Sequence, residues 1–403
     1  MSGNRLRYFK NLFYLMFSAA YHAFFRKRDQ GVVLVGAWMG EKFADNSRYL
    51  YQYLSSHAEQ LNLKHVVWAT RNPKLKEELE ASGYECCLIG TKESFDWHMK
   101  AGVHILCNAV TSYRHFQADI DTRYSYGAKK IQLWHGVGVK SIGVRSNSLR
   151  NRPQRRPSYL RRQLAAEGGW GNAYFLCTSP LNMDINQKNE NYIRDFMFIS
   201  MYPRYCQCLQ YTQNEKDIIE TIKTYPVSIL YLPTFRTTDG GYVHPLSDFE
   251  FCNWLSENGV LWIEKPHSAS SRNEEEAPNA VNRLLLDHSF DINVLYDFIT
   301  ILATDYSSAA FDAIYHQKPV LLYVPDLETY QTKDVGLLVD YSTFWPSLLC
   351  RNTAEIRETV SQAVHERFFT DERNSTYDRI RTEFFQNQQA NYEDIWDCIR
   401  NLK

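Results

Sequence analysis

Two patterns of apolar positions alternate along most of the chain. Short continuous apolar runs, typical of buried strands, are separated by segments whose apolar residues have helical spacing. Predicted helices include residues 73–82, 93–100 and 214–224. The strand-like runs lie at residues 31–38, 65–69, 84–89, 103–107, 130–134, 174–177, 227–232, 260–264, 299–304 and 320–324. Strands that alternate with helices predict parallel sheets with helices on both faces.

The alternation pauses near residue 205 and then restarts, which divides the chain into two α/β halves. We therefore predict a GT-B-type α/β fold, in which two doubly wound parallel-sheet domains face each other across a cleft. The predicted domains are residues 29–205 and 206–345, and residues 346–403 are predicted to form C-terminal helices that brace them. Ligands of such sheets bind at the carboxyl ends of the strands.

Residues 1–28 have a different character, with an aromatic and apolar stretch between basic ends. The stretch falls short of the roughly 20 residues that a membrane-spanning helix needs. It predicts an amphipathic helix, which either lies on an anionic membrane surface or packs on the protein itself; the aromatic residues and basic flanks favour the membrane. A second basic segment, the arginine-rich loop 145–162, is either a solvated excursion or a contact for lipid headgroups or a phosphate-rich acceptor.

Composition narrows the possible partners. The 403 residues carry a net charge of −1, so the chain as a whole has no attraction for nucleic acid. Its nine cysteines are scattered without the spacing of a zinc site, which favours free thiols in a reducing cytoplasm.

The stretch from residue 301 to 326 contains the strongest local signal. It predicts a strand, a tight turn, a helix and a second strand, with Ser307 and Ser308 where the helix begins. Unpaired backbone N–H groups, the two hydroxyls and the helix dipole would together form a seat for phosphate. We therefore predict a phosphorylated or nucleotide substrate.

Three other predicted strands deliver polar side chains to the same edge. His135, followed by Gly136, suits a general base, although a hydrogen-bonded structural histidine is the alternative. Lys265 and His267 could neutralise a diphosphate, or could form an ordinary surface turn. Arg236 could recognise phosphate in a bidentate manner, or could form a salt bridge.

Six segments in this order carry a family resemblance: GEKFADNSRYLY, QLWHGVGVKSIG, ISMYPRYCQCL, ILYLPTFR, EKPH and LATDYSSAAFDAIYHQKPVLLYVPDLETY. Together they resemble the CDP-glycerol glycerophosphotransferase family, which contains teichoic-acid primases and polymerases. The resemblance covers nearly everything from residue 31 to about residue 341. The run after His135, Val137-Gly138-Val139-Lys140, departs from the family pattern, and so does Tyr205-Cys206; both departures leave the acceptor less defined than the donor.

The resemblance implies roles for the site residues on the donor side. His135 would be the general base at the reacting phosphate, and His267 would contact the donor diphosphate and assist the departure of CMP. Ser307 and Ser308 would hold phosphate oxygens. Gly136, Arg236 and Lys265 are also predicted to bind substrate. Three further residues join them: Asp305 and, for the ribose, Asp312 or less strongly Glu328. Metal ligands and cofactors are not implied.

The function that this resemblance implies is transfer of glycerol phosphate from CDP-glycerol, or a related CDP-alditol, to a hydroxyl. The acceptor would be a lipid-linked glycan or a growing surface polymer such as a teichoic acid or capsule. The enzyme would be a peripheral protein on the cytoplasmic face of the cell membrane. Alternatives are ribitol phosphate transfer from CDP-ribitol, a GT-B glycosyltransferase that uses a nucleotide sugar, and a binding protein with a degenerate site.

Overall fold

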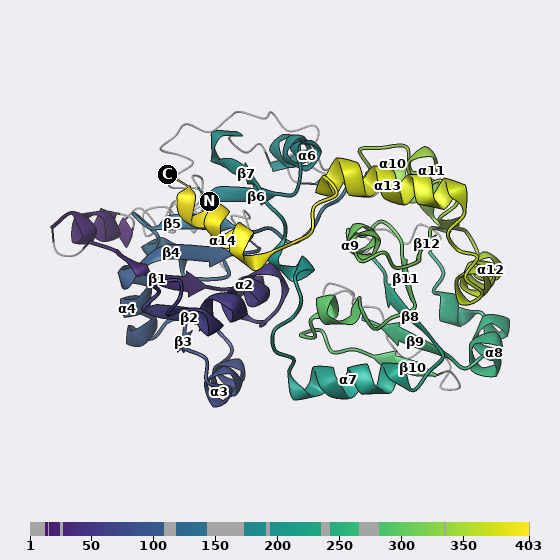
Figure 1. Cartoon of the computed structure of the whole chain (residues 1–403), viewed down its shortest axis with the longest axis horizontal. Coiled ribbons are helices and arrows are strands. Elements are labelled where there is room, and N and C mark those ends of the chain that lie inside the picture. The colour runs from purple at the N-terminus through teal and green to yellow at the C-terminus, as the bar shows by residue number, and fades with distance from the viewer. Residues whose placement is uncertain are drawn as a thin grey trace.

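The computed structural model describes residues 13–14, 16–24, 27–108, 118–142, 173–190, 194–234, 242–265, 282–333 and 336–402. These residues form two α/β domains, each built on a parallel sheet, with C-terminal helices packed along both (Figure 1). The predicted GT-B-type arrangement of two doubly wound domains is confirmed.

The N-terminal domain contains a seven-stranded sheet in the order β3-β2-β1-β4-β5-β6-β7. The order reverses between β1 and β4, and such switch points are where doubly wound sheets bind ligands. Its strands are β1 (Asp29–Val35), β2 (His65–Thr70), β3 (Cys86–Leu88), β4 (Ala101–Leu106), β5 (Lys129–Gln132), β6 (Tyr174–Cys177) and β7 (Met197–Ile199). The helices are α2 (Asp45–Ser56), α3 (Pro73–Ala81), α4 (Lys92–Lys100) and α6 (Pro180–Glu190).

The C-terminal domain contains a six-stranded sheet in the order β10-β9-β8-β11-β12-β13, with its switch point between β8 and β11. Every residue of β8 and β9 is buried, as expected for central strands covered on both faces. The strands are β8 (Val227–Leu232), β9 (Val260–Glu264), β10 (Arg283–Leu285), β11 (Ile301–Thr304), β12 (Val320–Tyr323) and β13 (Leu349–Cys350). The helices are α7 (Gln213–Lys223), α8 (Phe249–Glu257), α9 (Ala309–Tyr315), α10 (Leu327–Lys333), α11 (Tyr341–Phe344), α12 (Thr353–Val364) and α13 (Asp371–Phe385).

The C-terminal helices predicted within residues 346–403 include two that follow each other closely, α13 and α14 (Tyr392–Asn401). Gln386 and Asn387 both adopt φ of +53°, which ends α13, and α14 begins after a short connection. Figure 1 shows that α14 crosses back to the N-terminal domain. There Tyr392 stacks on Tyr53 with ring centroids 4.9 Å apart, so the end of the chain ties the two domains together.

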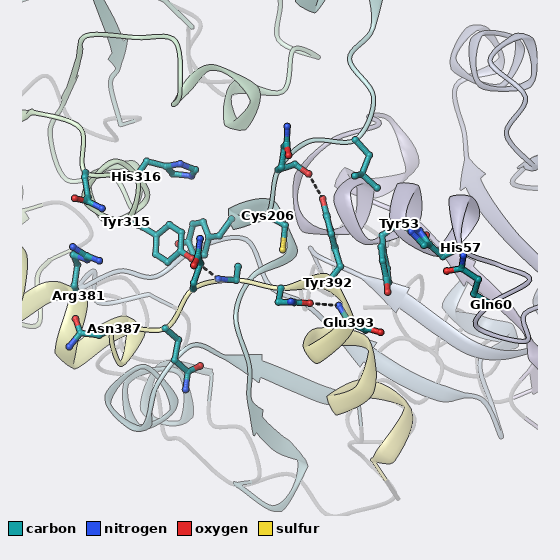
Figure 2. Close-up of a pocket in the computed structure, with 18 residues that line it drawn as sticks. Tyr53, His57, Gln60, Cys206, Tyr315, His316, Arg381, Asn387, Tyr392 and Glu393 are labelled. Carbon is teal, nitrogen blue, oxygen red and sulfur yellow. Dashed lines mark hydrogen bonds between the residues drawn. The ribbon is translucent and has the colours of Figure 1, made fainter.

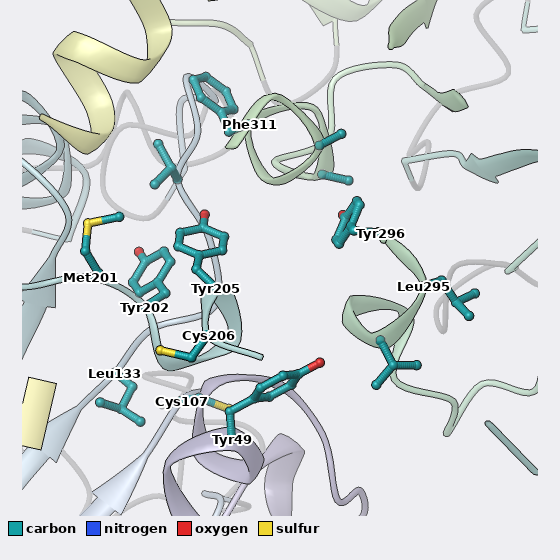
Figure 3. Close-up of a cluster of buried hydrophobic side chains, with 14 of the residues drawn as sticks. Tyr49, Cys107, Leu133, Met201, Tyr202, Tyr205, Cys206, Leu295, Tyr296 and Phe311 are labelled. Atoms are coloured by element: carbon teal, nitrogen blue, oxygen red, sulfur yellow. The ribbon is translucent and has the colours of Figure 1, made fainter. Parts of the chain in front are cut away.

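The hydrophobic core is continuous between the domains. Figure 3 shows the junction, where Tyr202 and Tyr205 of the connecting segment lie between side chains of the two domains. Tyr49 on α2 approaches from one domain and Phe311 on α9 from the other. The domains are therefore packed against each other and not merely tethered.

Residues 16–24 are helical, and one side of this helix packs on the N-terminal domain. Phe17 lies against Phe95 of α4 with ring centroids 6.4 Å apart, and the Ser18 hydroxyl reaches the sulfur of Met99. Phe17 is itself 42% exposed, and Phe13, Met16 and Phe24 are exposed at 65%, 62% and 81% respectively. No helix in the described segments is long and apolar enough to cross a bilayer. The basic loop 145–162 lies outside the described residues.

Candidate active site

A cavity of about 460 Å³ lies between the two domains, where the carboxyl ends of both sheets meet. It brings together residues that the sequence placed at separate strand ends. The predicted site residues that line it are His135, Gly136, Lys265, Ser307, Ser308 and Asp312. Arg236 and His267 lie outside the described residues, so their roles stay predictions.

His135 follows β5 on a tight, unusual turn. The preceding residue, Trp134, has a φ of +62°, a conformation that bulky residues rarely adopt. The imidazole Nδ1 lies 3.2 Å from the carbonyl oxygen of Cys107 at the end of β4. Because a carbonyl can only accept, Nδ1 carries the proton, and Nε2 is then the nitrogen that can accept one. Burial lowers the pKa of His135, partly opposed by Asp45, so the ring is held neutral as a base must be.

Gly136 and Ser308 are in direct contact across the cleft. A Cβ atom added at Gly136 would lie 2.7 Å from the Ser308 hydroxyl oxygen and 3.0 Å from its Cβ. Only glycine allows this approach, because any side chain would force the two segments apart. The backbone next to the candidate base therefore touches the predicted phosphate seat at the start of α9.

The carboxylate of Asp312 has partners that the sequence did not predict. Its Oδ1 accepts hydrogen bonds from Arg204 Nη2 at 2.7 Å and from the Tyr205 hydroxyl at 2.6 Å. Arg204 Nη1 donates to Asp45 Oδ1 at 2.8 Å and to the carbonyl oxygen of His135 at 2.9 Å. The guanidinium thus joins a carboxylate from each domain to the backbone of the candidate base. Asp312 lines the cavity, and its contact with a ribose stays a prediction.

This ion-pair network is buried. Arg204, Asp45 and Asp312 have side chains that are 3%, 4% and 5% exposed. Although burial opposes the charge, Asp312 and Asp45 hold the pKa of Arg204 well above its ordinary value. Arg204 and Asp45 lie in two of the segments that carry the family resemblance, YPRY and FADNSR. This was the only sequence signal that could have identified them as site residues.

Lysines supply positive charge around the cavity. Lys265, after β9, donates to the carbonyl oxygen of Phe290 at 2.5 Å. Burial and the neighbouring Lys42 lower the pKa of Lys265 to about 8. Lys140 Nζ lies 3.3 Å from the Thr234 hydroxyl, which links the two domains at another point of the cavity wall. An anionic ligand placed among Lys42, Lys140 and Lys265 would favour their charged forms.

Two predicted substrate-binding residues do not line this cavity within the described part of the chain. Asp305 is fully buried, and its carboxylate accepts from the backbone N–H groups of Thr234 and Tyr306. It therefore shapes the turns after β8 and β11 and does not face the ligand space. Glu328 is exposed in the first turn of α10. Direct contact of these two residues with substrate stays a prediction.

A larger cavity of about 950 Å³ lies at the hinge between α2, the connecting segment and the start of α14 (Figure 2). It contains none of the predicted site residues, although Tyr205 links it to the cleft. The Tyr205 ring stacks on Tyr315 with centroids 4.1 Å apart, while its hydroxyl binds Asp312. The smaller cavity is the candidate active site, because the candidate base, the two serines and the lysines all line it. Among the residues that the structure describes, His, Cys, Asp and Glu side chains form no cluster suited to a metal ion.

One family model and several curated relatives match most of the chain. The family model described as CDP-Glycerol:Poly(glycerophosphate) glycerophosphotransferase matches residues 15–394. A teichoic acid glycerol-phosphate transferase of Staphylococcus aureus is 24% identical over 377 residues, which are 89% of this chain and 88% of that protein. A teichoic acid poly(glycerol phosphate) polymerase of Bacillus spizizenii is also 24% identical, over 84% of each chain. The solved structure of the wall teichoic acid polymerase TagF aligns with a TM-score of 0.71 at 16% identity, covering 98% of this chain and 96% of that one, which shows the shared fold.

Proposed function

The chain belongs to the CDP-glycerol:poly(glycerophosphate) glycerophosphotransferase family, and we propose that it moves glycerol phosphate from CDP-glycerol to a hydroxyl of a lipid-linked glycan or growing surface polymer. The polymer would be a teichoic acid or a capsule-like chain. One observation carries the proposal: the Gly136–Ser308 contact places the candidate base beside the predicted phosphate seat.

The chemistry requires one proton transfer and one displacement at phosphorus. Nε2 of His135 takes the proton of the acceptor hydroxyl, and the hydroxyl oxygen attacks the β-phosphorus of the donor. The bond from that phosphorus to the oxygen bridging to CMP then breaks, and CMP leaves. His267 is the predicted partner of the departing phosphate.

Charge on the donor is neutralised by side chains from the C-terminal domain. Lys265 would contact the diphosphate, and Ser307 and Ser308 would donate hydroxyl hydrogen bonds to phosphate oxygens. Phosphoryl transfer needs positioning and charge stabilisation more than covalent help from the protein. The hydrogen bonds that join Arg204 to both domains would keep the base and the phosphate seat at a fixed spacing.

The activity is tested by a donor screen with the full-length protein. Purified protein, a lipid-linked disaccharide acceptor and CDP-glycerol should release CMP and lengthen the acceptor by glycerol phosphate. CDP-ribitol and a set of nucleotide sugars are the comparison donors. Turnover of a nucleotide sugar without turnover of either CDP-alditol would refute phosphotransfer and favour a glycosyltransferase.

We also propose that the N-terminal helix attaches the enzyme to the cytoplasmic surface of the membrane. Its outer side exposes Phe13, Met16 and Phe24, and basic residues flank it in the sequence. An exposed apolar face between cationic ends suits insertion into the headgroup region of an anionic bilayer. The inner side packs on α4, so the helix is presented from the domain surface at a fixed orientation.

Vesicle flotation tests this attachment without removing the packed side of the helix. The triple change Phe13→Ser, Met16→Ser and Phe24→Ser should abolish flotation with phosphatidylglycerol vesicles. A matched control is Phe249→Ser on α8, which removes an aromatic ring that is 69% exposed elsewhere on the surface. Equal flotation of the triple variant and the control would refute the proposed attachment.

A further inference from the structure

Trp38 occupies a strained loop at the carboxyl end of β1, one of the two strands at the switch point of the N-terminal sheet. Trp38 has a φ of +45°, and Met39 next to it has a φ of +59°. Large side chains rarely adopt this left-handed conformation, and two in succession indicate a loop that its surroundings hold in place.

The surrounding hydrogen bonds fix this loop firmly. The N–H of Met39 donates to Asp119 Oδ1 at 2.7 Å, and Arg71 Nη1 donates to the Met39 carbonyl oxygen at 2.6 Å. The Thr70 hydroxyl donates to the carbonyl oxygen of Gly40 at 2.6 Å. Asp119 is fully buried and also accepts the N–H of Cys107, whose carbonyl oxygen holds His135. The same small network therefore positions Trp38 and the candidate base.

The result is an indole beside the base on the wall of the cavity. The Trp38 and His135 rings have centroids 5.8 Å apart, and both residues line the cavity. The ring of Trp134 also contacts the imidazole, but it packs into the sheet against Phe175. Trp38 is half-buried, and its indole N–H has no hydrogen-bond partner among the described residues. Lys42 places its ammonium 5.4 Å from the Trp38 ring centroid.

These features match the chemistry of a polyhydroxylated acceptor. The face of an indole packs against the C–H groups of a sugar or polyol, while its N–H can donate to a hydroxyl. A nearby ammonium would interact with a phosphate of the acceptor. The predicted donor contacts Lys265, Ser307 and Ser308 all come from the C-terminal domain, which leaves this N-terminal wall for the second substrate.

We infer that Trp38 forms the acceptor subsite, in which the terminal sugar or polyol unit of the acceptor lies on the indole with its attacking hydroxyl at His135. This inference rests on the proposed function and adds the residue that selects the acceptor. Because water needs no such platform, hydrolysis of the donor would not depend on Trp38, whereas transfer to the acceptor would.

Steady-state kinetics of Trp38→Ala and Trp38→Phe test the subsite, with CDP-glycerol and a lipid-linked disaccharide as substrates. The alanine variant should raise the KM for the acceptor on the order of tenfold, the loss expected when an aromatic platform is removed, while the phenylalanine variant should retain most of the affinity. The KM for CDP-glycerol and the slow release of CMP without acceptor should stay at the level of the unsubstituted protein in both variants. Retained hydrolysis also shows that the variants are folded.

Trp97→Ala is the matched control. Trp97 on α4 also has a lysine over its ring, with the Lys100 ammonium 4.9 Å from the centroid, but it is not among the residues lining the cleft cavity in the described structure. An unchanged acceptor KM in Trp38→Ala would overturn the subsite, and so would an increase confined to the KM for CDP-glycerol. Absence of CMP release by the unsubstituted protein, with and without acceptor, would instead overturn the proposed function on which the subsite rests.

Discussion

Replacing Arg204 by methionine should both destabilise the protein and displace its pH profile. The substitution keeps an unbranched apolar chain and removes the guanidinium that lies between Asp45 and Asp312. Three hydrogen bonds from the guanidinium are lost, to these two carboxylates and to the carbonyl oxygen of His135. Both carboxylates stay buried without the cation that compensates them.

The size of the effect follows from burial. Removing one partner of a buried ion pair costs about 3–5 kcal/mol, because the remaining charge is left uncompensated in a low-dielectric site. The Tyr205 hydroxyl still donates to Asp312, which places the expected loss toward the lower end of that range. Adding Asp312→Asn to Arg204→Met should recover part of the loss, since it removes one of the two uncompensated charges.

The catalytic consequence concerns His135. Its charged neighbours are Asp45 on α2, Arg204 on the connecting segment and Asp312 on α9; the carboxylates raise its pKa, and Arg204 lowers it. Loss of the guanidinium therefore raises the pKa of His135. A general base must be deprotonated, so the acid limb of kcat/KM should move to higher pH in Arg204→Met. Arg204→Lys keeps the positive charge and should move the limb less.

Urea unfolding at pH 7 measures the stability, and CMP release between pH 5 and 9 measures the profile. A stability within about 1 kcal/mol of the unsubstituted protein would refute the argument from burial. An acid limb at the same pH in Arg204→Met and the unsubstituted protein would refute the electrostatic link between Arg204 and His135.

Two further predictions concern the base and its contact with the phosphate seat. Gly136→Ala should lower kcat by about 100-fold, because the new methyl group would force Ser308 and the base apart; Gly138→Ala, whose Cβ would lie 3.9 Å from Ser308 Cβ, is the control in the same assay and should cost much less. His135→Ala should lower kcat by roughly 10²–10⁴-fold while CDP-glycerol binding, measured by calorimetry, is retained; loss of binding with an unchanged rate at saturation would contradict its role as the base.

The fold could be predicted because buried parallel strands give continuous apolar runs. The central strands of both sheets were found from that pattern, and the strands it missed are short ones at sheet edges. These are β7, β10 and β13, of 3, 3 and 2 residues, which are too short to give a periodic signal. The helical pattern of the C-terminal residues also does not reveal the break between α13 and α14, because Gln386, which adopts the left-handed conformation at the end of α13, is not a residue that usually ends a helix.

Site residues could be predicted from the sequence only where a polar or ionisable side chain follows the end of a predicted strand. His135, Lys265 and Ser308 were found in this way, and the structure gathers them around one cavity. Arg204 could not be assigned, because an ion pair between residues 108 positions apart leaves no local pattern. Trp38 could not be assigned either, since its left-handed backbone is one that its residue type disfavours.

The donor side and the acceptor side of the cleft are held in place by different kinds of contact. The candidate base and the predicted phosphate site belong to different domains. Their spacing can therefore only be fixed by contacts between domains, which Arg204, Gly136 and Ser308 supply. The acceptor wall lies within one domain, and a strained backbone loop held by a buried carboxylate is sufficient there. A change in acceptor could therefore arise from the loop around Trp38 alone, while the Arg204 network and the donor contacts stay as they are.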